Sequence, residues 1–397
     1  MGENKPVGFI YTEDYNKYNF GEGHPLTPLR IEMTYHLMEQ YGLLDNPNLK
    51  ILQPQKATEE QVLRVHEPQY INKLKEISQM ENTRYLAFPE FGLGPGDNPV
   101  FPYMYDAALM VCGASIKAAD YLMENEDHVR AQNIVGGLHH AMPDMASGFC
   151  ILNDVAVAIA YIKSKRPDSK VLYVDIDCHH GDGVQWIFYD RPDVLTLSFH
   201  QDGKSLFPGT GFLKETGKGD GKGYALNFPF LPRTPANVYV STFREILPAI
   251  MSAYEPDYIV FQTGVDTHFT DPLTQMGLTT SAHEKLFKIM LDTVSKYSAD
   301  NLLVLGGGGY NIDVVARSWT LFLACLLDED IGEPLPDKWL SYLKKKWDEH
   351  PPPEKLRDRY PYMERRRLKD PYFFDEMQIY CDKIIDKFYS KLIPNIK

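Results

Sequence analysis

Short apolar runs alternate with longer segments of helical periodicity along most of this 397-residue chain. The runs have the length and composition of buried strands, and they lie at residues 7–11, 133–135, 170–174, 193–199, 224–228, 257–261 and 301–305. The helical segments are long enough to cross a sheet, and they lie at residues 105–123, 155–164, 237–254 and 282–297. The alternation predicts an α/β fold with a doubly wound, mainly parallel sheet of about eight strands and helices on both faces.

The length and apolar content of the chain fit one large domain, because hydrophobic residues make up 44% of the sequence and can fill a large core. The composition changes after residue 328, where prolines flank charged, aromatic-rich stretches of helical periodicity. We therefore expect a main domain at residues 1–328 and a helical extension at residues 329–397 that packs on it. The basic run at residues 365–367 is expected to lie on a solvated helix face.

Composition and net charge limit the compartment and the partners that we expect for the protein. No apolar run is long enough to span a bilayer, and the first residues lack the layout of a signal peptide, so we expect a cytoplasmic protein without membrane contact. Five cysteines without a CxxC pair fit a reducing compartment. A net charge of −13 argues against direct nucleic-acid binding but is compatible with cationic substrates.

Aspartates and histidines follow two of the predicted strands, where parallel sheets collect their ligands. Asp177 and His179 are alternate residues and point the same way, so both can bind one ion. Asp266 follows another strand, and we expect Gly264 to let the chain turn sharply into the site. Three ligands leave a coordination position open, as in catalytic zinc sites, and Fe²⁺ is an alternative because two carboxylates make a hard ligand set.

A pair of histidines, His139 and His140, follows the run at residues 133–135. A metal that lowers the pKa of water makes a neighbouring imidazole a sufficient general base. A histidine is a dependable base when an acceptor holds its second ring nitrogen, and Asp175 and Asp182 are suited to that role. Because adjacent residues point in different directions, we expect each histidine to have its own carboxylate.

Four consecutive glycines precede Tyr310 and follow the last predicted strand. Such a run indicates that the backbone passes very close to another group, and a narrow substrate tunnel is one explanation. Tyr310 would then place its hydroxyl against a carbonyl oxygen and stabilise the oxyanion of a tetrahedral intermediate. A phosphate-binding loop is the rival explanation, but no Lys-Ser/Thr pair follows the glycines.

Together these motifs closely resemble the class I histone deacetylases and the prokaryotic acetoin-utilisation deacetylases of the arginase/deacetylase superfamily. The similarity runs from about Gly8 to Leu327, so a deacetylase domain is expected at residues 1–328. The matching motifs are Gly23-His24-Pro25 with Arg30, and residues 65–70, 136–140, 147–154, 175–183, 207–211 and 306–310.

The resemblance implies roles for individual residues. Zinc would be bound by Asp177, His179 and Asp266, with His140 as general base and acid, His139 acting electrostatically and Tyr310 polarising the carbonyl. Other implied functions follow by position in the sequence. An acetyl-lysine channel would be lined by Gly148, Phe149, Phe207 and Leu273. Asp97 would grip the substrate backbone, and Arg30 would line an acetate-release path. A structural potassium would be held by Asp175, Asp177, His179, Ser198 and Phe199. Asp154 and His180 are expected to be structural supports.

The predicted function is hydrolysis of the acetyl group from N-ε-acetyl-lysine in proteins, with release of acetate. A small N-acetylated amine such as an acetylpolyamine is the alternative substrate. A non-catalytic acyl binder and a binuclear manganese enzyme of the ureohydrolase type are further alternatives. His268 follows Asp266 closely and would line the rim, contact substrate or assist a second ion, although position 181 is Gly, where the binuclear enzymes use a carboxylate.

Overall fold

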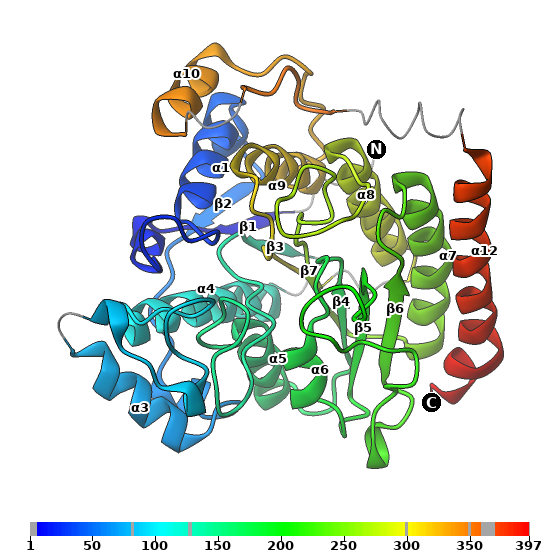
Figure 1. The fold of residues 1–397 in the computed structure, drawn as a ribbon, viewed down its shortest axis with the longest axis horizontal. Helices are drawn as coiled ribbons and strands as arrows, with labels where there is room; N and C mark the ends of the chain where they lie inside the picture. Colours follow the sequence, from blue (N-terminus) through cyan, green and yellow to red (C-terminus); the bar gives the residue numbers. More distant parts are fainter. Residues whose placement is uncertain are drawn as a thin grey trace.

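Eight parallel strands form one sheet in the described part of the chain, in the order β2-β1-β3-β8-β7-β4-β5-β6 (Figure 1). The computed structural model describes residues 6–80, 83–125, 129–297, 301–347, 351–358 and 370–396. The strands are β1 (Val7–Ile10), β2 (Leu49–Leu52), β3 (Arg130–Asn133), β4 (Val171–Asp175), β5 (Val194–Gln201), β6 (Ala225–Phe230), β7 (Tyr258–Gln262) and β8 (Leu302–Leu305). The predicted α/β fold is confirmed.

Two strands differ from the sequence prediction. β2 was not predicted, because it is an edge strand in which Lys50 and Ile51 are exposed, so it lacks a continuous apolar run. β3 ends at Asn133, where the predicted run at residues 133–135 begins. Its pairing with β1 and β8 uses the preceding residues, which include Arg130 and Gln132 and therefore do not look like a buried strand.

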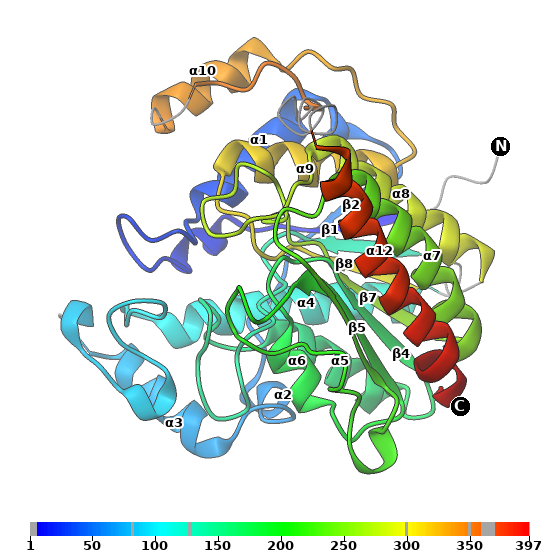
Figure 2. The ribbon, with the colours of Figure 1, turned by 45° about the vertical axis from the view of Figure 1, so that its right-hand side comes forward.

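Helices cover both faces of the sheet (Figure 2). The helices are α1 (Leu29–Gln40), α2 (Glu59–Val62), α3 (Pro68–Ser78), α4 (Met104–Glu124), α5 (Asp154–Lys165), α6 (Asp182–Ile187), α7 (Ala236–Tyr254), α8 (Thr280–Lys296), α9 (Ile312–Leu326), α10 (Asp337–Lys346) and α12 (Pro371–Lys387). α4 and α5 pack together on one face, whereas α1, α7, α8 and α9 form the layer on the other. None of the described helices is both long and apolar enough to cross a membrane.

The residues after 328 pack on this layered domain. Trp339 of α10 is fully buried and its Nε1 donates a hydrogen bond to the Met33 carbonyl of α1, at 3.0 Å. α12 lies against α7 (Figure 2). Cys381 of α12 and Phe388, the residue directly after it, are buried. The apolar core is therefore continuous across residue 328. The basic run at residues 365–367 lies outside the described residues.

Trp339→Ala tests how firmly α10 is part of this core. We expect the free energy of unfolding to fall by about 3–5 kcal/mol, because the substitution removes a fully buried indole and leaves a cavity. Denaturant unfolding followed by circular dichroism measures the change. Trp186→Ala is the matched control, since Trp186 is 38% exposed and its loss should leave the midpoint nearly unchanged. Equal effects of the two substitutions would contradict the integral packing of α10.

Candidate active site

The carboxyl ends of four neighbouring strands carry most of the predicted site residues. β3, β8, β7 and β4 lie side by side in the sheet, so the loops that follow them meet at one edge. The loop after β3 carries the histidine pair and the loop after β8 carries Tyr310, while Asp266 follows β7 and His179 follows β4. The strand order thus brings together residues that are far apart in the sequence.

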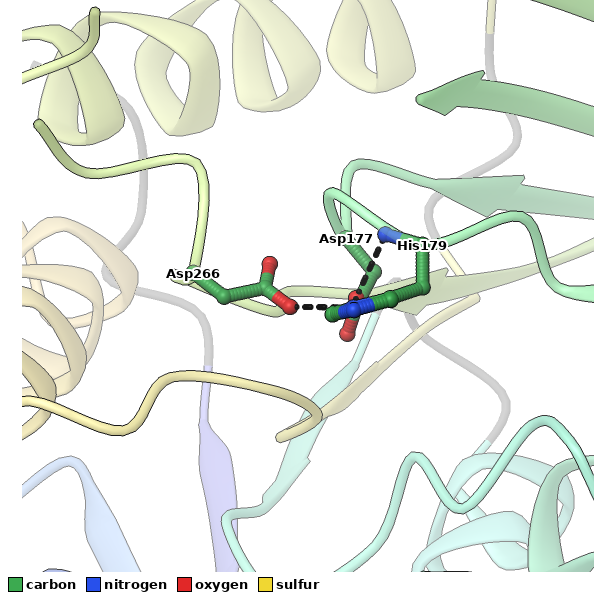
Figure 3. Close-up of side chains that lie close together, drawn as sticks. All are labelled: Asp177, His179 and Asp266. Carbon is green, nitrogen blue, oxygen red and sulfur yellow. Dashed lines mark hydrogen bonds and ion pairs between the residues drawn. The ribbon is translucent and has the colours of Figure 1, made fainter. Parts of the chain in front are cut away.

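Asp177, His179 and Asp266 converge on one buried point (Figure 3). The Nδ1 atom of His179 lies 2.7 Å from Oδ2 of Asp266 and 3.2 Å from Oδ1 of Asp177. One ligand atom from each side chain lies within 4.8 Å of the other two. Two carboxylate oxygens and one imidazole nitrogen so arranged form a donor set for a divalent cation.

The electrostatics of this triad also fit a cation. Burial and the neighbouring charge of Asp177 raise the pKa of Asp266 well above its ordinary value. Burial lowers the pKa of His179, but its hydrogen bonds with both carboxylates outweigh this and raise the pKa to about 10. Two buried carboxylates repel each other unless positive charge lies between them. A divalent ion supplies that charge, so the residues present fit a bound metal.

Gln262, the last residue of β7, fixes the orientation of Asp177. Its Nε2 donates to Oδ2 of Asp177 at 2.7 Å and to the Gly137 carbonyl at 3.2 Å. Oδ2 of Asp177 also accepts from the Gly308 amide at 2.7 Å. Sequence reasoning missed Gln262; the only signal in the sequence was a glutamine directly after an apolar run, and its complete burial is seen in the structure.

Two glycines near the triad are needed for space. A Cβ atom on Gly264 would lie 2.1 Å from Oδ2 of Asp177, and one on Gly308 would lie 2.4 Å from Oδ2 of Asp266. The backbone of Gly264 is not in the left-handed region, so the space beside Asp177 is what requires a glycine there. That Gly264 lets the chain turn sharply stays a prediction. Within the glycine run before Tyr310, Gly308 passes close to the triad carboxylates and Gly307 passes close to Gln262. A substrate tunnel beside this run stays a prediction.

The two histidines have separate carboxylate partners, which are the predicted ones. Nδ1 of His139 lies 2.8 Å from Oδ2 of Asp175, and Nδ1 of His140 lies 2.7 Å from Oδ1 of Asp182. The two Nε2 atoms lie 3.1 Å apart. Each carboxylate therefore accepts the Nδ1 proton, which leaves Nε2 as the variable nitrogen on each ring.

The pKa values of the two imidazoles are displaced in opposite directions. Burial lowers the pKa of His139, but the carboxylates of Asp175 and Asp177 outweigh it and raise the pKa to about 9. Burial and the positive charge of His139 lower the pKa of His140 to about 4, although Asp182 opposes them. These displacements favour a cationic His139 and a neutral His140 near neutral pH.

Aromatic rings surround the histidines and Tyr310. The Phe207 ring lies 5.1 Å from the His140 ring, and the Phe149 ring lies 5.6 Å from the Tyr310 ring, between centroids. A Cβ on Gly148 would lie 2.4 Å from Cδ2 of His140 and 3.0 Å from Cε1 of Phe207, so only glycine fits between them. Phe207 and Leu273 are 44% and 38% exposed.

Comparison with known proteins agrees with this arrangement. Residues 24–326 match the histone deacetylase domain model. The acetoin utilization protein AcuC of Bacillus subtilis is 38% identical over 338 residues, which cover 85% of this chain and 86% of that protein. Histone deacetylase 1 of Homo sapiens is 37% identical over 337 residues, covering 85% and 67%. This chain belongs to the histone deacetylase family.

The structural comparison gives the same family. A histone deacetylase homologue from Aquifex aeolicus has a TM-score of 0.80 and 32% sequence identity, with 90% of this chain and 95% of that chain covered. The predicted histone deacetylase type is therefore confirmed, and the chain is a hydrolase of the deacetylase class. The roles of individual site residues stay predictions.

The remaining residues implied by the histone deacetylase resemblance lie around this centre. Arg30 is buried and donates to the carbonyls of Gly307 and Gly309, at 3.0 and 2.7 Å. Asp97 is exposed, and its carbonyl is 3.2 Å from Nε2 of His24. Ser198, inside β5, pairs with Asp175, the last residue of β4, so two of the predicted potassium residues are neighbours in the sheet. Their ligand roles stay predictions.

The two predicted structural supports make contacts of that kind. Asp154 accepts hydrogen bonds from the amides of Gly137 and Leu138, at 3.1 and 2.7 Å, and so holds the loop that leads to the histidine pair. The ring of His180 contacts Thr210 at 2.8 Å, and burial lowers the pKa of His180 to about 3.

His268 does not occupy the place that the sequence suggested. It was expected to line the rim, contact substrate or assist a second ion. Its side chain is instead buried, and its Nε2 lies 2.9 Å from Oδ2 of Asp358, in the segment after α10. The expectation was wrong because the contact joins distant parts of the chain that no local pattern connects.

Asp266→Asn tests the metal site. We expect the full-length wild type to bind one divalent ion per chain, and the variant to bind it more weakly by more than about 100-fold, the upper end of the loss caused by removing an outer contact alone. Elemental analysis after dialysis and a chelator titration measure the change. Asp271→Asn is the matched control, because Asp271 is buried on the same loop but accepts from the amides of Leu273 and Tyr310. Normal metal binding by Asp266→Asn would contradict the site.

Proposed function

We propose that this chain is a metal-dependent hydrolase that removes the acetyl group from N-ε-acetyl-lysine side chains of proteins and releases acetate. The observation that carries the proposal is the pair of imidazoles beside the Asp177, His179 and Asp266 triad: each is held by its own carboxylate, and their Nε2 atoms lie 3.1 Å apart. Their pKa values are displaced in opposite directions. Amide hydrolysis needs a neutral base and a fixed positive charge within reach of the same carbonyl. His140 and His139 supply these two properties.

Each of these residues has a separate role in the proposed reaction. When bound at the triad, a divalent ion supplies Lewis acidity, which lowers the pKa of water and polarises a carbonyl. His140 takes a proton from the water that adds to the acetyl carbon, and returns a proton to the lysine nitrogen as the C–N bond breaks. Acetate and a free amine are the products. His139 stays protonated and stabilises the developing negative charge.

Tyr310 is proposed to donate a hydrogen bond to the carbonyl oxygen in the transition state. Burial, with the nearby carboxylates of Asp266 and Asp177, raises the pKa of its hydroxyl well above the ordinary value, so the hydroxyl keeps its proton. Asp271 holds the Tyr310 amide at 2.8 Å, which fixes the backbone from which the ring projects. A held, protonated donor suits oxyanion stabilisation.

The channel residues support a long, apolar substrate stem. Gly148, Phe149, Phe207 and Leu273 would wall the methylenes of acetyl-lysine, which need apolar contacts on both sides. The exposure of Phe207 and Leu273 gives the rim an apolar surface open to solvent, which favours a side chain presented on a protein. We propose that Asp97 contacts the substrate backbone and that Arg30 lines the path of acetate.

We propose zinc as the resident metal, with Fe²⁺ as the alternative, because the triad offers two oxygens and one nitrogen. We also propose a structural potassium ion where β4 ends, beside the middle of β5. Its ligands would come from Asp175, Asp177, His179, Ser198 and Phe199.

Tyr310→Phe tests the oxyanion role. We expect kcat on an acetyl-lysine peptide to fall by about 100- to 1,000-fold, because one transition-state hydrogen-bond donor is lost, while KM changes little. Steady-state acetate release measures both constants, and metal content must match the wild type. Phe149→Leu is the control, since it changes the channel wall and should act mainly on KM. An unchanged kcat for Tyr310→Phe would contradict the mechanism.

The pH profile of kcat/KM tests the proposed protonation states of the two histidines. Activity should rise with pH through the His140 pKa of about 4 and fall through the His139 pKa of about 9, because the base must be neutral and its neighbour charged. Asp175→Asn removes the carboxylate that raises the pKa of His139, so the basic limb should move to lower pH. Asp154→Asn, which changes another buried carboxylate, should leave that limb in place. An unmoved limb in Asp175→Asn would contradict the assignment.

A substrate panel separates the proposed substrate from its alternative. We expect the wild type, loaded with one equivalent of zinc, to have a kcat/KM at least about tenfold higher for acetyl-lysine peptides than for acetylpolyamines. Acetate release from both classes is the measurement, and longer acyl-lysines complete the series. A preference for acetylpolyamines would overturn the substrate proposal. Peptide binding without turnover would overturn the enzymatic one.

A further inference from the structure

Asp358, in the segment after α10, contacts the loop that carries Asp266. Its Oδ2 accepts hydrogen bonds from Nε2 of His268 and from Nη1 of Arg317, both at 2.9 Å. Its Oδ1 accepts from the Thr280 amide at 2.9 Å. Asp358 lies outside the residues that match the family domain, yet its partner His268 is two positions after a triad residue.

The tautomer of His268 is fixed by its second contact. The ring Nδ1 accepts from the Thr270 amide at 3.3 Å and lies 2.9 Å from the Thr270 hydroxyl, so the proton is on Nε2, which faces Asp358. The same hydroxyl oxygen lies 2.8 Å from Nδ2 of Asn311, the residue after Tyr310. The hydrogen bonds that start at Asp358 therefore reach the loops of both Asp266 and Tyr310.

The loop between these contacts is short and closed by its own backbone. The His268 amide donates to the Val265 carbonyl at 3.1 Å, and the Leu278 amide donates to the Thr267 carbonyl at 3.2 Å. A displacement of the His268 ring is thus transmitted to the backbone on either side of Asp266. Catalytic groups need placement to within about 0.5 Å, and a closed loop gives Asp266 little freedom of its own.

The charged groups around Asp358 fix the positions of their partners more than they add to the free energy of folding. Arg317 is buried and pairs with Asp313 of its own helix as well as with Asp358. Buried ion pairs add little net stability, because desolvation offsets the attraction, but they define one arrangement of their partners. Both carboxylate oxygens of Asp358 accept hydrogen bonds. Few other side chains could accept from His268, Arg317 and Thr280 at the same time.

We propose that Asp358 is a positioning residue for the metal site, acting through His268 on the loop that presents Asp266. This inference rests on the proposed metal site. It assigns the residues after the family domain a part in the geometry of the catalytic centre, in addition to their packing on the core.

The test compares zinc affinity in full-length Asp358→Asn and Glu284→Gln. An asparagine at 358 must turn its NH₂ group toward a donor in either orientation, so the contact with His268 or with Thr280 is lost. Glu284→Gln is the matched control: Glu284 binds Nε and Nη2 of the adjacent Arg357, at 2.6 and 2.9 Å, and holds the same segment to α8. We expect the zinc Kd to rise by about tenfold or more in Asp358→Asn and to stay unchanged in Glu284→Gln.

Chelator competition gives the Kd, and the visible spectrum of the cobalt-substituted protein reports ligand geometry independently of activity. The cobalt spectrum should change in Asp358→Asn and keep its wild-type form in Glu284→Gln. His268→Gln should reproduce the loss, and the double variant should lose no more than either single variant, because the two residues act as one unit. His268→Gln carries the test alone if Asp358→Asn does not fold.

The possible results distinguish a failure of the positioning role from a failure of the proposed function. Wild-type zinc affinity and an unchanged cobalt spectrum in folded Asp358→Asn, or in His268→Gln, would overturn the positioning role. An equal loss in Glu284→Gln would also overturn it, because general docking of the segment would then explain the effect. A wild-type protein that binds no zinc would overturn the proposed function instead.

Discussion

The buried negative charge of Asp177 and Asp266 is the constraint on which the rest of the centre depends. Both carboxylates lie at the carboxyl edge of a sheet covered on its two faces by helices, where water cannot screen them. The surrounding groups respond to that charge: Gln262 and the Gly308 amide donate to Asp177, and the Cys178 amide donates to Asp266 at 2.6 Å. These donors orient the carboxylates without neutralising them, so the site is compatible with a bound cation.

The same charge separates two histidines that are neighbours in sequence. Nδ1 of His139 donates to Asp175, and its Nε2 lies 3.9 Å from the Asp177 carboxylate. Nδ1 of His140 donates to Asp182 instead. A charged His139 then holds the pKa of His140 down, since two cations 3.1 Å apart repel each other. The carboxylates near His139 therefore favour its protonated form and, through its charge, the neutral form of His140.

The sequence allowed prediction of those parts of the fold and site that follow local rules. Apolar runs located most strands, and the motifs that follow them indicated the family, so the fold and the family were predicted correctly. Asp177 and His179 lie close together, but in the bend after β4, which ends at Asp175, and not by alternation along a strand. Features that depend on distant contacts were not predicted. β2 pairs with β1 alone. Gln262 donates to the carboxylate of Asp177, which follows the neighbouring strand β4, and Gly264 is needed because Asp177 lies beside it. Only the packed sheet reveals such neighbours.

The contact between His268 and Asp358 shows how such distant neighbours extend the centre beyond the family domain. Arg317 is buried on α9, and a buried guanidinium requires acceptors on every side. Asp313 satisfies part of it from within the helix, while Asp358 and the Leu356 carbonyl, at 2.9 and 3.3 Å, satisfy the rest from the following segment. Because Asp358 also accepts from His268, the arrangement that satisfies Arg317 is the same one that fixes the loop of Asp266. Docking of the residues after α10 and the geometry of the triad are thus coupled through one carboxylate.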